Sequence, residues 1–432
     1  MGSTKSALHQ ISEKESLRHA WKAISKRNLR SKGLDNVTIA AFKSNLEENL
    51  AQIGVELRAR SYIFNKLRAH AIDKPGSSKK RPLQIAAVRD RVVMKAVAMF
   101  ISPAFDQFNL PCSFAYVKGG GVGPVVGRIH DLIGQGHKTY LEADIIDFFG
   151  TVDRDLLWSR FSKHVRHKSL LPLIRQCFDL ELGNLDDLKT EDQKLFVGSD
   201  SGIPQGGVLS PMLANYYLFE FDRKMLKKGF NLVRYADDFV VMCESREMAE
   251  RAHDLCKSTL KSLKLEIHPL GSPKTRIGEF SKDGLSFLGL HFQGKEVFPS
   301  EKIRDRFRTK IKEVLKPHSG LSLFKTLQKL SNLIHGWGNY YRAMYVVEIY
   351  VALDKFVKTS VTAYLKESGI VLLGRNKRKQ MRLLGIPSLS AMIDHRRQAS
   401  TTIVASLKQI GAVESSGSTR TAPDKAPKGL TA

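Results

Sequence analysis

Two adjacent aspartates, Asp237 and Asp238, lie between two short apolar segments, residues 232–235 and 239–242. This pattern predicts a β-hairpin whose turn carries both carboxylates. Two like charges held against apolar strands repel each other, so a nearby cation should compensate them. Arg234 is adjacent and could do so, and Mg²⁺ would do it better, because Mg²⁺ binds one or two carboxylates together with substrate phosphates. The alternative is a solvated turn, since Asp is a common turn former.

A third aspartate, Asp144, lies near the end of a predicted apolar strand at residues 140–146. An unpaired carboxylate at that point would be costly to bury. If the strand lies beside the hairpin, Asp144 meets Asp237 and Asp238. The three carboxylates could then hold two metal ions about 4 Å apart, the arrangement used for in-line phosphoryl transfer.

Several segments of the chain together resemble the reverse transcriptases of group II introns and related bacterial enzymes. They follow the order of that family and cover residues from about 30 to about 390. The matching segments are Arg81-Pro82-Leu83 with Val88–Val93, Asp144–Phe149, Gly202–Pro211, Tyr235–Asp238, Lys274-Thr275 with Phe287–Gly289, and His335–Arg342. Each segment is a weak signal alone, whereas the ordered set is specific.

The resemblance assigns the catalytic and metal-binding residues. It implies two Mg²⁺ ions held by Asp144, Asp237, Asp238 and the carbonyl oxygen of Ile145. In such a site one ion activates a primer 3′-hydroxyl and the other holds the triphosphate of the incoming nucleotide.

The resemblance also assigns five nucleotide-binding residues. Lys74 and Arg81, on a predicted hairpin, are expected to neutralise the triphosphate; a solvated pair of charges is the alternative. Gln205 is expected beneath the sugar. Phe149, five residues after Asp144, should exclude a ribose 2′-hydroxyl, although spacing alone would place it in the core. Lys274 is expected to protonate the leaving pyrophosphate, or else to be an exposed structural lysine.

The fold implied by the resemblance is an α+β right-hand polymerase, with fingers, a palm containing an antiparallel sheet, and a helical thumb. We expect an N-terminal helical extension of the fingers, then fingers and palm, a thumb, a basic helical segment and a disordered tail. Their expected ranges are 1–70, 71–297, 298–360, 361–411 and 412–432.

Charge favours a nucleic-acid partner. The 432 residues include 69 Lys and Arg against 43 Asp and Glu, a net charge of +26. Such an excess is self-repulsive unless a polyanion neutralises it, and each neutralised phosphate releases counterions. A merely basic protein is the alternative. We expect RNA contacts at a C-terminal basic cluster, Arg375, Lys377, Arg378 and Lys379.

The cysteines and the hydropathy pattern bear on the cellular location. Cys112, Cys177, Cys243 and Cys256 form no CxxC pair, so they are expected to be buried thiols of a reducing cytoplasm. No apolar run approaches the ~20 residues of a membrane span, and no membrane partner is expected.

The expected function is an RNA-directed DNA polymerase that uses dNTPs, an RNA template and a DNA primer or product. No Cys/His cluster of an endonuclease follows the thumb, so the chain most resembles the free-standing enzymes of this lineage, many of which serve in antiphage defence. That resemblance implies that the template is a structured, dedicated non-coding RNA copied in such defence. The alternative is a compact group II intron maturase that supports splicing and retrohoming. A catalytically inactive RNA-binding scaffold is disfavoured, because Asp144, Asp237 and Asp238 are all intact.

Overall fold

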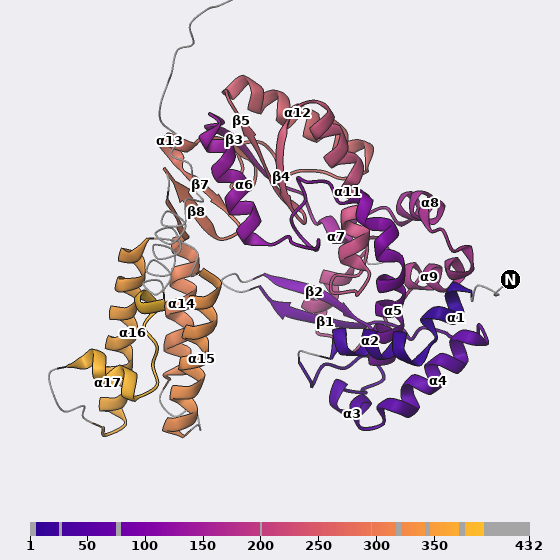
Figure 1. The fold of residues 1–432 in the computed structure, drawn as a ribbon, viewed down its shortest axis with the longest axis horizontal. Coiled ribbons are helices and arrows are strands. Elements are labelled where there is room, and N and C mark those ends of the chain that lie inside the picture. The colour runs from indigo at the N-terminus through magenta and orange to yellow at the C-terminus, as the bar shows by residue number, and fades with distance from the viewer. Residues whose placement is uncertain are drawn as a thin grey trace, which may run out of the picture. The chain divides into compact units, whose positions relative to one another are not determined.

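The structure, a computed structural model, describes residues 6–25, 28–74, 79–198, 201–294, 296–316, 322–341, 346–370 and 376–392. The chain divides into two units, Met1–Arg306 and Phe307–Ala432. The second unit holds the helices drawn in orange to yellow in Figure 1. Within the described ranges, no helix is long and apolar enough to cross a membrane.

Four short helices begin the first unit: α1 (Ala7–Ile11), α2 (Lys14–Ile24), α3 (Ile39–Ser44) and α4 (Leu46–Arg58). All four contact the long helix α5 (Val88–Phe105). Leu17, Ala20 and Trp21 recur at helical spacing on α2 and are buried, and the rings of Trp21 and Phe42 lie 5.2 Å apart. The N-terminal region is therefore a helical layer on α5.

A two-stranded antiparallel hairpin follows, formed by β1 (Arg68–Asp73) and β2 (Lys80–Ile85). The segment leading into β1 is anchored to α5 through Asp90, which is fully buried. Asp90 accepts hydrogen bonds from the Tyr62 hydroxyl at 2.7 Å and from the amide of Asn65 at 3.0 Å. These bonds compensate the buried carboxylate and fix the base of the hairpin.

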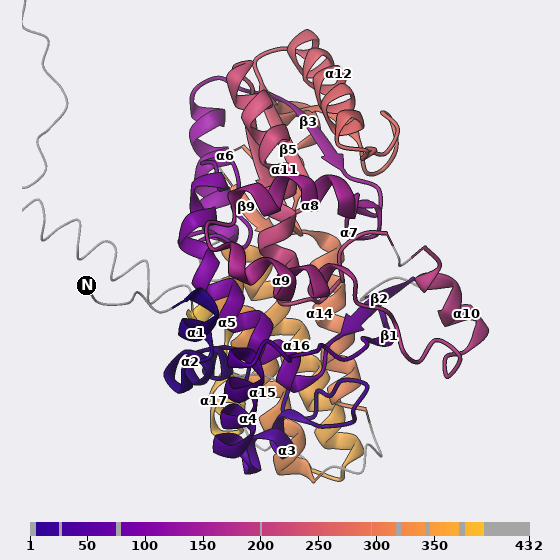
Figure 2. The ribbon, with the colours of Figure 1, turned by 90° about the vertical axis from the view of Figure 1, so that its right-hand side faces the viewer.

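The central sheet has four antiparallel strands in the order β4-β5-β3-β6. They are β3 (Thr139–Asp144), β4 (Asn231–Tyr235), β5 (Asp238–Cys243) and β6 (Arg276–Glu279). Helices α6 (Val122–Gly134), α11 (Ser210–Lys227) and α12 (Arg246–Ser262) contact its strands (Figures 1 and 2). Leu141, Phe239 and Val241 of the sheet are buried in the main hydrophobic core. The helix and antiparallel-sheet fold class expected from the sequence is confirmed.

Short helices connect β3 to α11: α7 (Phe148–Thr151), α8 (Arg154–His164), η2 (Lys168–Leu170), α9 (Leu171–Phe178), α10 (Thr190–Gln193) and η3 (Lys194–Phe196), while η1 (Asp106–Phe108) extends α5. Aromatic rings join these helices to the core. Phe105 stacks on Phe161 at 4.6 Å, and Tyr216 of α11 packs edge-on against Phe105 at 5.2 Å. This cluster fixes α5, α8 and α11 to one another.

The first unit ends with α13 (Phe280–Asp283) and a three-stranded antiparallel sheet, β7 (Leu285–Phe287), β8 (Leu290–Gln293) and β9 (Glu296–Pro299). All four cysteines, Cys112, Cys177, Cys243 and Cys256, are free and buried in this unit. Burial raises the pKa of each thiol. The expectation of buried thiols is confirmed.

The second unit is helical. It contains most of α14 (Glu301–Val314), followed by α15 (Leu323–Tyr341), α16 (Val347–Glu367) and α17 (Lys377–Leu383). Trp337 of α15 stacks on Phe307 of α14 with centroids 4.6 Å apart. The buried hydroxyl of Tyr350 on α16 donates to the carbonyl of Tyr341 at 2.7 Å. These contacts give the unit its own core.

Candidate active site

The structure brings the three aspartates together at one edge of the central sheet. β3 lies directly beside β5, and Asp144, the last residue of β3, is the cross-strand partner of Asp238. Asp238 is also paired with Tyr235 of β4, so Ala236 and Asp237 form a two-residue turn between β4 and β5. Asp237 therefore lies at the hairpin tip, next to the Asp144–Asp238 pair.

The turn requires an uncommon backbone conformation. Ala236 has a φ of +59°, in the left-handed region that residues with a Cβ rarely adopt. A two-residue hairpin turn of the primed type requires this sign of φ, usually supplied by Gly or Asn. Ala236 is also buried, and its carbonyl accepts a hydrogen bond from Nη1 of Arg234 at 2.9 Å. The unfavourable conformation is thus held in place by a side chain two residues earlier.

Arg234 is fully buried, and all five of its N–H groups are used. Nε and Nη2 donate to the two carboxylate oxygens of Asp222 on α11, at 2.7 and 2.6 Å. The remaining bonds reach Asn215, Ser113 and the Ala236 carbonyl, at 3.2, 2.8 and 2.9 Å. The ion-pair partner of Arg234 is therefore Asp222, its hydrogen bond to the turn is to the backbone, and its charge acts on Asp237 electrostatically.

The pKa values of two of the carboxyl groups, those of Asp237 and Asp238, are raised. Although Asp238 as a residue is exposed, surrounding protein desolvates its carboxyl group, and the charges of Asp237 and Asp144 add to this, raising its pKa to about 7. Burial, with the charge of Asp144, also raises the pKa of Asp237. The ammonium group of Lys274 contacts Oδ2 of Asp144, and Nε2 of His268 lies 3.7 Å from the same oxygen. A lysine ammonium and a histidine ring from the following segment of chain thus lie close to Asp144.

The donor set fits Mg²⁺ completed by a substrate. Among the described residues, no group of three or more His, Cys, Asp or Glu side chains is close enough to hold a metal unaided. Asp144 and Asp238 do lie side by side, and the raised pKa of Asp238 indicates negative charge around it that lacks sufficient counter-charge. Mg²⁺ usually takes only one or two carboxylates and fills its remaining positions with water and phosphate oxygens.

The segment containing Gln205 connects the sheet edge to the hairpin. The amide of Ile203 donates to the carbonyl of Phe149 at 2.8 Å, and the amide of Gln84 on β2 donates to the carbonyl of Gln205 at 3.1 Å. Gly202 has a φ of +82°, and a Cβ there would lie 2.3 Å from the Phe149 carbonyl oxygen. This close approach requires glycine, and it fixes the backbone of Phe149 relative to that of Gln205.

Phe149 is only partly buried. Its ring packs edge-on against the buried ring of Phe148, with centroids 5.4 Å apart. A phenylalanine buried wholly in the core would expose neither face of its ring. The structure therefore leaves part of the Phe149 ring available beside the strand that ends at Asp144.

Lys74 and Arg81 lie on the β1–β2 hairpin. Arg81 is exposed and opposite Ile72 in the strand register, and Lys74 follows the end of β1. The positive charge of Arg81 opposes the rise in the pKa of Asp237, which places its guanidinium within electrostatic reach of the turn. Lys74 acts similarly on the carboxyl group of Asp147, whose pKa is raised by burial.

The basic C-terminal cluster is only partly described. Arg375 lies outside the described residues. Lys377 and Arg378 form the start of α17, but their side chains are outside the description, and Lys379 is exposed.

Sequence reasoning missed three contributors to the site. Asp222 and His268 gave no signal, because their partners are distant in sequence. Tyr116 has a φ of +62° and a 56% exposed side chain, in a segment bonded to β4 through the amide of Phe114 and the carbonyl of Arg234. Partial burial and the charge of Asp237 raise the pKa of Tyr116, so an exposed aromatic ring lies near the turn.

Two family profiles match the chain. The profile described as "Reverse transcriptase (RNA-dependent DNA polymerase)" matches residues 72–292, which contain the carboxylates and the expected nucleotide-binding residues. The profile described as "Group II intron, maturase-specific domain" matches residues 304–368.

Individual relatives agree with these matches. Protein YkfC of Escherichia coli (strain K12) is 26% identical over 323 residues, covering 65% of this chain and 81% of that protein. The group II intron-encoded protein LtrA of Lactococcus lactis subsp. cremoris is 27% identical over 197 residues, covering 46% of this chain but only 31% of LtrA. A solved structure, "Partial Cas6-RT-Cas1--Cas2 complex", is 26% identical, with a TM-score of 0.36 over 60% of this chain and 42% of that chain.

Proposed function

The chain belongs to the reverse transcriptase (RNA-dependent DNA polymerase) family, of the group II intron type, and we propose that it extends a primer with deoxynucleotides by copying an RNA template. The observation that supports this most directly is the pairing of Asp144 with Asp238 beside the Asp237 turn. In-line transfer of a nucleotidyl group needs fixed negative ligands at the point where a 3′-hydroxyl meets a triphosphate.

We assign the binding of two Mg²⁺ ions to Asp144, Asp237, Asp238 and the carbonyl oxygen of Ile145. When bound, these ions supply positive charge that stabilises the charge developing on the reacting phosphate and on the leaving pyrophosphate. Lys274 contacts Asp144 from the segment after α12, and this contact supports a role in which its ammonium gives a proton to the leaving pyrophosphate.

The remaining residues bind and select the nucleotide. Arg81 and Lys74 on the hairpin offset the charge of the triphosphate, and a guanidinium can bind two phosphate oxygens at once. We assign Gln205 to the position beneath the sugar; the backbone bonds that join its segment to β2 and to Phe149 support this role. The partly exposed ring of Phe149 fills the space that a 2′-hydroxyl needs, which makes dNTPs the substrates.

The domain assignment follows from this role. We assign the fingers and palm to residues 71–297, with residues 1–70 extending the fingers, and the thumb to residues 298–360. We propose that the basic segment 361–411 binds RNA through Arg375, Lys377, Arg378 and Lys379. Residues 393–432, which include the expected tail 412–432, lie outside the described residues. The net charge of +26 supports a large RNA surface.

The proposed template is a structured RNA encoded beside the gene and copied into DNA in antiphage defence. The complete set of carboxylates and the high positive charge support copying of a bound RNA; the step to defence rests on resemblance to free-standing enzymes of this lineage. A second function, assistance of intron splicing, is favoured by the maturase-specific match at residues 304–368.

Primer extension tests the activity. Replacing Asp237 and Asp238 by Ala should abolish extension of a DNA primer on an RNA template while leaving RNA affinity unchanged. A matched control exists in Asp186 and Asp187, another adjacent pair, which is exposed; the same replacement there should leave extension intact. Extension by the Asp237/Asp238 variant within about tenfold of wild type would contradict the metal assignment.

Sequencing of co-purified nucleic acid tests the template. The protein is expressed with its flanking DNA and isolated, and the bound RNA and DNA are sequenced. One dominant RNA with complementary DNA, lost together with phage protection in the Asp237/Asp238 variant, is expected. A spliced intron RNA with unchanged phage plating would assign the protein to the maturase function instead.

A further inference from the structure

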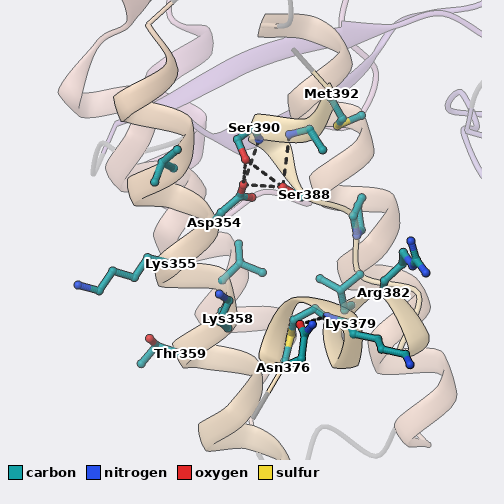
Figure 3. A pocket seen from close by; sticks show the side chains of 16 residues that line it. Asp354, Lys355, Lys358, Thr359, Asn376, Lys379, Arg382, Ser388, Ser390 and Met392 are labelled. Atoms are coloured by element: carbon teal, nitrogen blue, oxygen red, sulfur yellow. Dashed lines mark hydrogen bonds between the residues drawn. The ribbon is translucent and has the colours of Figure 1, made fainter. Parts of the chain in front are cut away.

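A pocket of about 1270 Å³ lies entirely within the second unit, between α16, α17 and the segment that follows α17. Figure 3 shows Asp354, Lys355, Lys358 and Thr359 along α16 and Asn376, Lys379 and Arg382 on the α17 side. Pockets that hold drug-sized ligands measure roughly 300–1,000 Å³, so at least one nucleotide has room here.

Positive charge flanks this pocket on two sides. Lys355 and Lys358 line it from α16, while Lys379 and Arg382 line it from α17 (Figure 3). Within the described part of the chain, no ion pair holds any of the four, and three of them are exposed. Figure 3 shows the side chains of Lys355 and Lys379 extending outward from their helices, so positive charge lies at the rim of the hollow and favours an anionic group there.

The single acidic side chain of the pocket, Asp354, is already hydrogen-bonded and does not form an ion pair with the four cations. Asp354 accepts hydrogen bonds from the hydroxyls of Ser388 and Ser390, at 2.7 and 2.6 Å, and from the amides of Leu389 and Ser390, at 2.7 and 3.0 Å. Its oxygens are therefore committed to the segment after α17. The same bonds fix that segment to α16, so the pocket wall is held in place before a ligand arrives.

Apolar side chains form the rest of the lining. Met381 and Ile386 are buried in the wall, Met392 is partly exposed, and Val351 exposes 52% of its surface. Methionine adapts its shape to flat ligands and binding surfaces. An apolar wall beside a ring of cations matches a nucleotide, whose base is flat and apolar on its faces and whose phosphate is anionic.

The chain's own C-terminal residues match the pocket poorly. Residues 393–432 contain six Lys and Arg but only three Asp and Glu, so their net charge has the same sign as the pocket. A basic segment would add to the repulsion among the four cations.

We propose that this pocket receives an unpaired nucleotide of the bound RNA, with the base against Met381, Ile386 and Met392 and the flanking phosphates between the α16 and α17 cations. The inference rests on the RNA binding of the proposed function and adds a preference for single-stranded or bulged RNA. A base in a duplex is stacked and paired, so it cannot enter the pocket without the cost of extrusion.

Two variants of the full chain separate charge from shape. Lys358→Gln with Lys379→Gln removes two phosphate contacts. Ala391→Phe places a ring in the pocket without changing any charge, because Ala391 lines it. The matched control is Lys325→Gln with Lys329→Gln, two exposed lysines of α15 outside the pocket. Thermal melting followed by circular dichroism checks that each variant folds.

Fluorescence anisotropy measures affinity for two probes of equal length, a mixed-sequence single-stranded RNA and a blunt RNA duplex. Ala391→Phe should weaken single-strand binding about fivefold or more, the lower end of what one lost base contact costs, while duplex binding stays unchanged. Replacing Lys358 and Lys379 by Gln should weaken single-strand binding more than replacing Lys325 and Lys329 by Gln. The proposal would be overturned if the pocket variants weakened binding of the single strand and of the duplex equally, or if they weakened binding of neither.

Primer extension distinguishes this inference from the proposed function. On a preformed primer–template, the pocket variants should extend at the wild-type rate. Wild-type protein that binds single-stranded RNA through the pocket but extends no primer would refute the polymerase function alone. Pocket variants indistinguishable from wild type in single-strand affinity, in a protein that does extend primers, would refute the pocket alone.

Discussion

The guanidinium of Arg234 and the carboxylate of Asp222 form a two-pronged ion pair inside the protein, directly behind the turn that carries Asp237. Both residues are fully buried. Since Arg234 also bonds the Ala236 carbonyl, the pair connects α11 to the catalytic turn. Its expected role is to position the turn.

Replacing Arg234 by Lys tests this role. A lysine has three donors in place of five, so Asp222 keeps a weakened partner and the Ala236 carbonyl loses its bond. We expect a loss of about 1–3 kcal/mol in the free energy of unfolding, as when buried polar groups lose hydrogen-bond partners, measured by urea denaturation. Primer extension should fall at least about tenfold, with a higher Mg²⁺ concentration for half-maximal rate.

A double replacement separates positioning from stability. Arg234→Met with Asp222→Leu removes both charges together, so no unpaired charge stays buried and stability should largely recover. Activity and Mg²⁺ dependence should not recover, because the turn still lacks its bond. Wild-type extension by this double variant would show that the pair serves stability alone.

Phe149→Ala should allow incorporation of ribonucleotides, because the volume of the ring is what excludes the 2′-hydroxyl. The measurement is the ratio of kcat/KM for dNTP to that for the matching NTP, which should fall at least about tenfold, or about 1.4 kcal/mol. Phe148→Leu is the control, since Phe148 is the buried neighbour that supports the ring. A ratio equal to that of wild type would place the sugar selection elsewhere.

Lys274→Gln should lower the Mg²⁺ concentration needed for half-maximal extension, because the ammonium group occupies Oδ2 of Asp144 in the metal-free protein. An exposed ion pair contributes about 0.2–1 kcal/mol, so the expected change is about 1.5- to 5-fold. The maximal rate should fall through loss of the proton donor. Lys282→Gln, which removes a surface pair with Glu279, is the control. An unchanged Mg²⁺ requirement would contradict the idea that the Lys274 ammonium competes with Mg²⁺ for Asp144.

Asp238 should make the metal-free protein less stable as the pH rises. Its folded-state pKa is raised from 3.8 to about 7, so between these values the folded protein keeps a proton that the unfolded chain releases. The bound proton therefore stabilises the folded protein at low pH, and this stabilisation is lost as the pH rises through this window. The melting temperature in EDTA should fall from pH 4.5 to 7.5 relative to Asp238→Asn, and Mg²⁺ at pH 7.5 should restore it. If the melting temperatures of the wild type and of Asp238→Asn changed with pH in parallel, this prediction would be contradicted.

The sequence predicted the carboxylate edge because strong local signals met there. Asp144 ends an apolar strand and Asp237 lies on the turn of an apolar hairpin. Placing the two carboxylates side by side lets one set of cations compensate both of them. The adjacency of Arg234 to the turn did not reveal that its ion-pair partner is Asp222. Strand alternation did hold the clue: Arg234 shares a face with buried Leu232, and a buried arginine needs a carboxylate, which lay twelve residues earlier on α11.

Other elements gave too little signal. Strand β6 (Arg276–Glu279) is four residues long with a single large apolar side chain, so its place beside β3 depends on pairing across more than 130 residues. Helix α6 contains three glycines, which made its first turns indistinguishable from the glycine-rich loop before it. The pocket of the second unit joins α16 to a segment 35 residues later through Asp354, a contact that no local pattern encodes.

The burial of all four thiols has a practical consequence. Maleimide dyes react with the thiolate, and burial keeps each native thiol protonated and out of reach. A cysteine introduced at an exposed site is therefore the preferred target in an otherwise unaltered chain. Asp186→Cys in the first unit and Lys325→Cys in the second would accept a donor and an acceptor dye, and energy transfer between them would report, in solution, how the two units move when RNA binds.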